Sequence, residues 1–238
     1  MDNNNMSIGE LHEQLFLSIS SIIIEGKSIN SIYDYIYFFF KSNSITEIPG
    51  TNAVSLNINN IVYHGVPRKG SFSSGDVVTV DVCFCYRREF IDGAKTFIVG
   101  SVSDRVKNLV LVSRDVILSV SKIIEAGTTV GSIIKFISDY VAIRGFYLFP
   151  HGMGHGIGKE LHVSPILSLS NYSDWKIKLE VGDYFTIEPI IFLKEEDVIE
   201  NILGEGYISD GNISSQFEVS MEVNNSGGVN ILNRSLLN

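Results

Sequence analysis

Five side chains of this 238-residue chain could together bind metal ions: four carboxylates and one imidazole. In sequence order they are Asp81, Asp92, His155, Glu188 and Glu218. All but Asp92 stand in segments that are otherwise apolar or rich in glycine, such as VVTVDVCF, YFTIEPII and SQFEVSMEV. A charge buried in such a segment persists when it is paired or bound to a metal. A solvated strand face explains any one of them, but four in the same setting favour a metal site.

The donor set narrows the choice of ion. Carboxylates and imidazole suit hard to borderline divalent cations. Carboxylates that bridge allow two such ions to lie about 3.5 Å apart. The five residues therefore predict two divalent metal ions as cofactors, of Co, Mn, Fe or Zn.

The stretch from Phe149 to Pro165, FPHGMGHGIGKELHVSP, is the richest in candidate ligands, with three histidines and four glycines. Histidine is the commonest transition-metal ligand near neutral pH. Glycines on both sides of His155 allow the backbone to approach a ligand closely. Taken alone, the stretch leaves a glycine-rich turn with surface histidines as an open alternative.

The candidate ligands fall on predicted strands that follow predicted helices. Apolar residues at helical spacing predict helices at Leu11–Ile23, Ile29–Lys41, Asp104–Glu125 and Val130–Arg144. Alternation and β-branched runs predict strands at Asn52–His64, Val77–Tyr86, Glu89–Val99, Tyr184–Phe192, Gln216–Val223 and Val229–Leu232, with a polar hairpin loop around Asn201–Asn212. The pattern predicts an α+β fold and, without a linker or charge run to divide it, one domain.

Composition excludes several classes of partner. The net charge is −9, from 27 acidic and 18 basic residues, and no block of Lys or Arg stands out, so we expect neither nucleic acid nor a membrane surface. No apolar run reaches the roughly 20 residues of a transmembrane helix. The acidic N-terminus is unlike a signal peptide. Cys83 and Cys85 are two residues apart, a spacing unsuited to a disulfide, which favours a cytoplasmic protein.

The chain resembles the methionine aminopeptidases of bacterial and organellar type, which are creatinase-like or "pita-bread" metallopeptidases. Nearly everything after about Ser44 carries the resemblance, in the blocks NNIVYHGVP, SGDVVTVDV, FIDGAKTFIVG, MGHGIGKELHVSP, LEVGDYFTIEPII and SSQFEVSMEV. The separations of the five candidate ligands are close to the family's: 92 − 81 = 11, 155 − 92 = 63, 188 − 155 = 33 and 218 − 188 = 30.

The resemblance implies a pita-bread fold, with a curved antiparallel sheet, helices on its outer face and two pseudo-twofold halves. It implies one catalytic domain over residues 1–238, in which about 1–43 are a helical lead-in and about 44–238 are the family core. The implied activity is removal of the N-terminal methionine from nascent proteins. The implied partner is the N-terminal peptide of a nascent chain, with transient ribosome contact, and we expect a monomer.

The resemblance also assigns the metal ligands. It implies that Asp81 binds one ion, that Asp92 and Glu218 bridge both, and that His155 and Glu188 bind the other.

Three residues receive catalytic roles from the same resemblance. Glu188 is implied to carry a proton from the attacking water to the leaving amine. His162 is implied to stabilise the oxyanion, and His64 to contact the amide nitrogen of the scissile bond.

The pocket for the methionine side chain departs from the family pattern. Gly50, Ser55 and Tyr63 stand where the family often has Tyr or Cys. Leu161 replaces a common Phe, and Tyr207 stands in for a Trp. A rebuilt pocket of similar size would still accept methionine, because a thioether fits loosely packed apolar surroundings.

Two other functions stay open. His151 is additional to the usual pattern, and PHGMGHGIG is similar to the prolidase and aminopeptidase P relatives, so an Xaa-Pro peptidase is the first alternative. Those relatives have a further N-terminal domain. The second alternative is a non-catalytic binding module of the same fold, although such modules usually lose ligands.

The role of Cys83 stays open between two interpretations. Cys83 either packs as a small apolar side chain or, by strand alternation, lies on the ligand side with Asp81.

Overall fold

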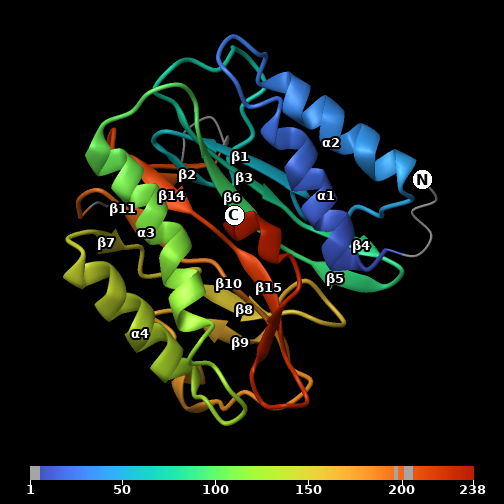
Figure 1. The fold of residues 1–238 in the computed structure, drawn as a ribbon, viewed down its shortest axis with the longest axis vertical. Helices are drawn as coiled ribbons and strands as arrows, with labels where there is room; N and C mark the ends of the chain where they lie inside the picture. Colours follow the sequence, from blue (N-terminus) through green and yellow to red (C-terminus); the bar gives the residue numbers. More distant parts are fainter. Residues whose placement is uncertain (1–5, 196–197, 201–205) are drawn as a thin grey trace.

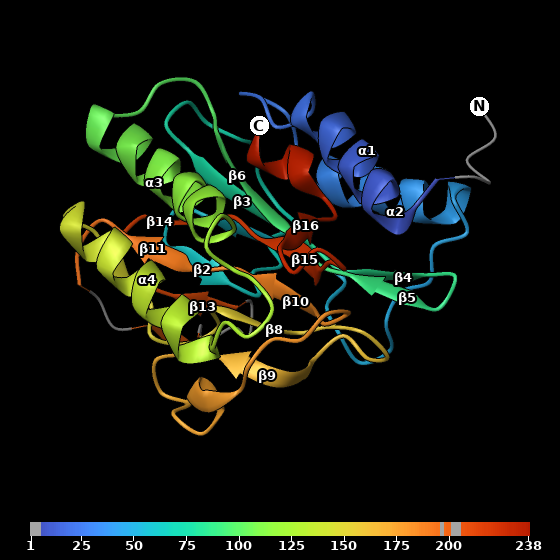
Figure 2. The same cartoon turned by 60° about the horizontal axis from the view of Figure 1, so that its bottom comes forward.

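Helices cover one face of a layer of antiparallel strands in the computed structural model, which describes residues 6–195, 198–200 and 206–238 (Figures 1 and 2). The helices of these residues are α1 (Ile8–Ser20), α2 (Asn30–Ser42), α3 (Asp104–Val120) and α4 (Val130–Ile143), with short 3-10 turns η2 (Asp174–Lys176) and η3 (Arg234–Leu237). The helix pair α1 and α2 lies over one half of the strands, and the pair α3 and α4 lies over the other (Figure 1). The predicted α+β class is therefore confirmed.

The strands of the first half are β1 (Val54–Ile58), β2 (Ile61–Tyr63), β3 (Val77–Val82), β4 (Phe84–Tyr86), β5 (Glu89–Ile91) and β6 (Ala94–Ile98). The second half contains β7 (Tyr147–Leu148), β8 (Gly154–Gly156), β9 (Val163–Leu167), β10 (Tyr184–Ile187), β11 (Ile190–Phe192), β12 (Ile199–Glu200), β13 (Tyr207–Ile208), β14 (Ser214–Gln216), β15 (Val219–Val223) and β16 (Val229–Ile231). Each half thus repeats the same order of two helices followed by strands.

Two antiparallel sheets carry the candidate ligands. The first has the order β1-β3-β6, and the second has the order β16-β15-β10-β8-β9. The two sheets join between β6 and the residue before β15, where Glu218 N–H donates to Ala94 O at 2.8 Å and Ala94 N–H donates to Glu218 O at 3.3 Å. This pair of main-chain bonds brings the ligand-bearing segments of the two halves together.

Several predicted strands are interrupted, and that prediction was wrong in detail. The segment Tyr184–Phe192 divides between β10 and β11 at Glu188, and Gln216–Val223 divides between β14 and β15 at Glu218. The segment Glu89–Val99 divides at Asp92, between β5 and β6. Period-two alternation cannot register such breaks. At each break, a residue with a carboxylate side chain lies outside the regular strand-to-strand hydrogen bonding.

The segment Asn52–His64 contains two strands, β1 and β2, which belong to different sheets, rather than one strand. Asn59 takes the left-handed conformation, with φ 57°, at the turn between them. Asparagine tolerates this conformation better than most residues. The polar loop expected around Asn201–Asn212 lies in part outside the described residues, which resume at residue 206.

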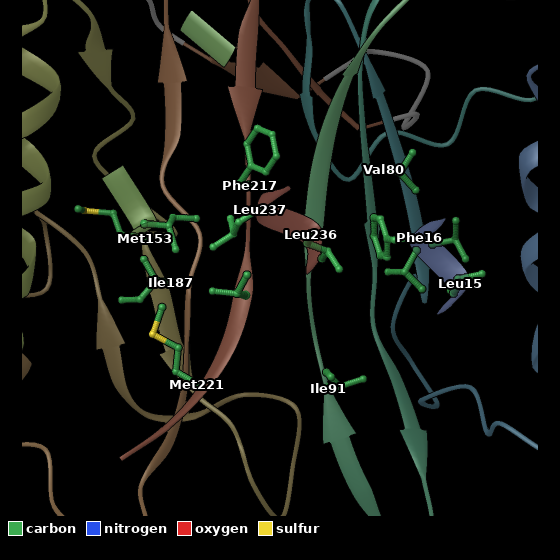
Figure 3. Close-up of a cluster of buried hydrophobic side chains, with 14 of the residues drawn as sticks. Leu15, Phe16, Val80, Ile91, Met153, Ile187, Phe217, Met221, Leu236 and Leu237 are labelled. Carbon is green, nitrogen blue, oxygen red and sulfur yellow. The ribbon is translucent and has the colours of Figure 1, made fainter. Parts of the chain in front are cut away.

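One hydrophobic core lies beneath both halves. Helix α1 begins at the N-cap Ser7, whose side chain forms a capping box with Glu10, and turns its apolar face inward. Figure 3 shows Leu236 and Leu237 of the C-terminal turn between core residues of the two halves. The cluster includes Leu15, Phe16, Val80, Ile91, Met153, Ile187, Phe217 and Met221. The packing therefore fixes one half against the other. No helix of the described residues is both long and apolar enough to cross a membrane.

The buried His12 of α1 should make folding stability depend on pH. Burial lowers its pKa from 6.5 to about 4. Below about pH 6.5, His12 binds a proton in the unfolded chain but stays neutral in the folded chain. The contribution of His12 to stability is therefore complete above that pH and is lost toward pH 4. The loss is about 3 kcal/mol for this residue. Urea unfolding of wild type and His12→Gln should show a shallower pH dependence in the variant.

The matched control for this measurement is His151→Gln, because the side chain of His151 is exposed. It should keep the wild-type pH dependence. Parallel curves for wild type and His12→Gln would contradict the prediction.

Candidate active site

The five predicted ligands converge from both halves of the fold. The potential ligand atoms of Asp81, Asp92 and Glu218 lie within 4.8 Å of one another, and so do those of His155, Glu188 and Glu218. Asp92 also belongs to a group with His155 and His162. Asp92, His155 and Glu218 each belong to two of these groups, so the described residues form one connected cluster of potential ligands for divalent metal.

His155 presents an unprotonated nitrogen to the carboxylates. Its Nδ1 lies 3.0 Å from the carbonyl oxygen of Gly156, which can only accept, so Nδ1 carries the proton. Its Nε2 faces Asp92 Oδ2 at 3.8 Å and Glu188 Oε1 at 3.6 Å. Burial lowers the pKa of His155 to about 4, which keeps the ring neutral. A neutral imidazole with a fixed outer N–H is the form that binds a metal.

Glu188 is oriented by two residues that the sequence analysis missed. The side-chain nitrogen of Gln216 donates to Glu188 Oε2 at 3.3 Å and to its main-chain oxygen at 3.1 Å. The Thr186 hydroxyl donates to Glu188 Oε1 at 3.4 Å. Each residue stands two positions before a predicted ligand, which is the one sequence signal that could have marked it.

The carboxylates carry more negative charge than their surroundings balance. Burial raises the pKa of Asp81 to about 7. Burial and then the charge of Asp81 raise the pKa of Glu188 to about 8. Burial and neighbouring carboxylates raise the pKa of Asp92 and Glu218 well above their usual range. One oxygen of Glu218, Oε1, is buried without a hydrogen-bond partner in the described structure. Divalent cations fit this site because they would neutralise the charge and use the free oxygen.

Two cavities flank the ligands. The first, which we call the β1 cavity, has a volume of about 420 Å³ and is lined by Gly50, Thr51, Asn52, Ser55, Cys83, Asp92 and Leu161. The second, which we call the aromatic cavity, has a volume of about 280 Å³ and is lined by Tyr63, Phe149, His151, His155, Glu188, Ile190, Gln216 and others. His64, Asp81 and His162 line both cavities, so they stand at the boundary between them.

The two predicted catalytic histidines face this boundary. The ring of His162 lies 4.4 Å from the ring of His155. His64 has a left-handed backbone, with φ 56°, and the next residue, Gly65, donates its N–H to Asn57 Oδ1 at 2.8 Å. Burial lowers the pKa of both histidines, and in His64 the neighbouring His162 adds to the effect. Both rings therefore favour the neutral form, in which each offers one N–H donor.

The predicted pocket residues divide between the cavities. Gly50, Ser55 and Leu161 line the β1 cavity, whereas Tyr63 lines the aromatic cavity and stacks on Tyr207 at 4.3 Å between ring centroids. The sequence predicts one pocket for these residues and does not reveal the separation.

The remaining candidates also have definite positions. Cys83 lines the β1 cavity, so it lies on the ligand side of β3, as alternation indicated. Its side chain is nevertheless 94% buried, with 6% exposure, and burial raises the pKa of its thiol. His151 lines the aromatic cavity and bonds the Ser170 hydroxyl at 2.9 Å, and it is in none of the ligand groups of the described residues.

The sequence of the chain matches the model of metallopeptidase family M24 over residues 6–232. The chain belongs to this family. The match begins at residue 6, within the helical lead-in, so α1 and α2 belong to the family region as well as the part after about Ser44. A methionine aminopeptidase of Buchnera aphidicola from Acyrthosiphon pisum is 30% identical over 86% of this chain and 79% of its own. The resemblance to methionine aminopeptidases is therefore confirmed.

Solved structures confirm the pita-bread fold. The methionine aminopeptidase of Thermotoga maritima superposes with a TM-score of 0.88 at 27% identity, covering 94% of this M24 chain and 93% of that one. The prolidase of Pyrococcus furiosus superposes with a TM-score of 0.71 at 22% identity and is covered over 60% of its length. The prolidase likeness shows the fold alone, whereas the aminopeptidase matches over its whole length.

Removing divalent ions should destabilise the protein more at about pH 8 than at about pH 5.5. The raised pKa values of Asp81 and Glu188 mean that the folded, metal-free chain holds protons which the unfolded chain has released. The contribution of these two carboxyl groups to the stability of the metal-free protein is therefore complete below about pH 4. It is lost as the pH rises through about 7 to 8. Bound cations replace these protons. Differential scanning fluorimetry should show a larger increase in Tm with Mn²⁺ over EDTA at the higher pH.

A variant sharpens this measurement. Asp81→Asn removes one repelling charge, so it should melt above wild type in EDTA at about pH 8 and gain less from Mn²⁺. Glu222→Gln is the control, because Glu222 lies on β15 and bonds the Tyr184 hydroxyl instead of a ligand. Equal melting temperatures in Mn²⁺ and EDTA for wild type would contradict the proposed charge balance.

Proposed function

We propose that this protein is a methionine aminopeptidase that removes the N-terminal methionine of nascent proteins. The observation that carries the proposal is the overlap of three candidate ligand groups, which share Asp92, His155 and Glu218 between them, at the boundary of two cavities. Its sequence similarity to methionine aminopeptidases supports the choice of substrate. We assign two divalent ions, of Co, Mn, Fe or Zn, to Asp81, Asp92, His155, Glu188 and Glu218. When bound, such ions supply Lewis acidity and lower the pKa of water.

The two cavities divide the substrate between them. The β1 cavity receives the N-terminal side chain, since Leu161 and Cys83 give it apolar lining and it borders His64 and Asp92. The aromatic cavity receives the following residues of the peptide, along Tyr63 and Phe149. The scissile bond then lies at the boundary, between the ligands and the two histidines.

The protein's own side chains move the protons and hold the developing charge. Glu188 takes a proton from the attacking water and gives it to the leaving amine, while Gln216 and Thr186 keep its carboxylate in place. His162, kept neutral by burial, donates an N–H to the developing oxyanion. His64 contacts the amide nitrogen of the scissile bond.

The domain organisation, oligomeric state and cellular location are part of the same proposal. We propose a single catalytic domain over residues 1–238 that acts as a monomer in the cytoplasm, where new N-termini emerge. Contact with the ribosome would be transient.

Purified protein supplied with Mn²⁺, Co²⁺ or Fe²⁺ should release methionine from a Met-Ala-Ser peptide. Metal-free protein should release none, because activation of water needs the ions. Met-Pro and Xaa-Pro peptides, assayed side by side by chromatography, should be poorer substrates. Preferential cleavage of Xaa-Pro would favour the prolidase-like alternative, and absence of cleavage with every ion would favour the binding module.

His162→Ala should lower kcat by about 10²- to 10³-fold with little change in KM, because an oxyanion donor acts in the transition state. The bound metal per chain, measured by elemental analysis, should equal that of wild type. Glu222→Gln is the activity control, since Glu222 lies outside both cavities. A loss of metal in His162→Ala would instead make His162 a ligand, as its grouping with Asp92 and His155 permits.

A further inference from the structure

The main chain of Asp92 is held by side chains instead of by a sheet ladder. Asp92 lies in the break between β5 and β6, where its N–H and C=O have no strand partner. Its N–H donates to Ser220 Oγ at 3.1 Å, and the Ser220 hydroxyl donates back to Asp92 O at 2.9 Å. The side-chain nitrogen of Asn233 donates to the same oxygen at 3.0 Å. Two residues from the C-terminal segment therefore replace the missing ladder.

His12 extends this arrangement to the strand of Asp81. Its Nε2 lies 2.9 Å from the carbonyl oxygen of Val82, so Nε2 carries the proton. Its Nδ1 must then accept from Asn233 Nδ2, at 3.3 Å. The Asn233 oxygen in turn accepts the N–H of Ser220 at 3.0 Å. Each donor of the Asn233 side chain has one acceptor, which fixes the amide in a single orientation.

The arrangement has no room to relax. His12, Ser220 and Asn233 each have 0% exposed surface. A methyl group added at Gly93 would lie 2.5 Å from Asn233 Nδ2 and 2.7 Å from His12 Cε1. Since these side chains are fully buried and a larger residue at position 93 does not fit, a lost hydrogen bond would leave a buried polar group unsatisfied.

We propose that His12, Ser220 and Asn233, here called the positioning triad, hold Asp92 at the distance from Asp81 that the cations require. Asp92 Oδ1 accepts the N–H of Gly93 at 2.9 Å, so the triad, by fixing this turn, also directs Oδ2 toward the site. The triad contacts no substrate. It acts through the main chain of Asp92 and through Val82, the neighbour of Asp81. This inference rests on the proposed metal site.

Calorimetric titration of metal-free protein with Mn²⁺ tests the positioning triad. Ser220→Ala and Asn233→Ala should bind Mn²⁺ about 10- to 100-fold more weakly than wild type, as is typical for residues that orient a ligand. At saturating Mn²⁺ the KM for Met-Ala-Ser should stay near the wild-type value. Gly93→Ala, which displaces the triad without removing a polar group, should weaken Mn²⁺ binding as well.

Ser209→Ala is the matched control. Ser209 is buried and its hydroxyl donates to Asn212 O at 2.8 Å, so the variant loses a buried hydrogen bond without touching the triad or lining either cavity. Its Mn²⁺ affinity should equal that of wild type even where its Tm falls as far as that of Ser220→Ala. Wild-type affinity in Ser220→Ala, or an equal loss in Ser209→Ala, would overturn the proposal. Should Asn233→Ala fail to fold, Ser220→Ala carries the measurement, because it keeps the Asn233 bond to Asp92.

The outcome for wild type separates this inference from the proposed function. Failure of wild type to bind Mn²⁺ would overturn the metal site and the positioning triad together. Binding and cleavage by wild type, with unchanged affinity in the triad variants, would overturn the positioning triad alone.

Discussion

The repulsion among four buried carboxylates is the constraint on which the rest of this structure depends. Asp81, Asp92, Glu188 and Glu218 converge where the nearest base, His155, is neutral. The effective cost of removing each charge from water is several kcal/mol, and mutual repulsion increases it. Protons or cations must offset that cost. Folding of the chain and occupation of the site by divalent ions are therefore linked.

Three of the four carboxylates lie at interruptions of the antiparallel strands, where the backbone leaves the regular sheet. The first half supplies Asp81 and Asp92, and the second half supplies His155, Glu188 and Glu218. Neither half holds a complete set, so the hydrophobic core that fixes one half against the other also determines the distances between ligands. Side chains such as Ser220 and Asn233 occupy the hydrogen-bonding positions that the broken ladder leaves open.

The departures from the family pattern that the sequence leads us to expect lie in the walls of the cavities and not at the proposed ligands. Gly50, Ser55 and Leu161 make the wall of the β1 cavity smaller-sided and more polar than a wall of Tyr, Cys and Phe would be. The ligand residues are constrained by charge and geometry, so few substitutions are tolerated there. A cavity wall is constrained mainly by volume and polarity, so it can vary while the reaction stays the same.

The sequence by itself indicated the five candidate ligands, their order, the helices and the family, because charged residues in apolar segments, helical periodicity and short sequence blocks are local signals. It did not determine where strands break, since Glu188 and Glu218 continue a period-two pattern that the backbone does not follow. It marked Thr186 and Gln216 only by their place two positions before a predicted ligand, and it did not mark the positioning triad. Their roles arise from contacts such as that between His12 and Asn233, 221 positions apart. Only tertiary packing decides such contacts, because no local pattern encodes which distant side chains share a buried hydrogen bond.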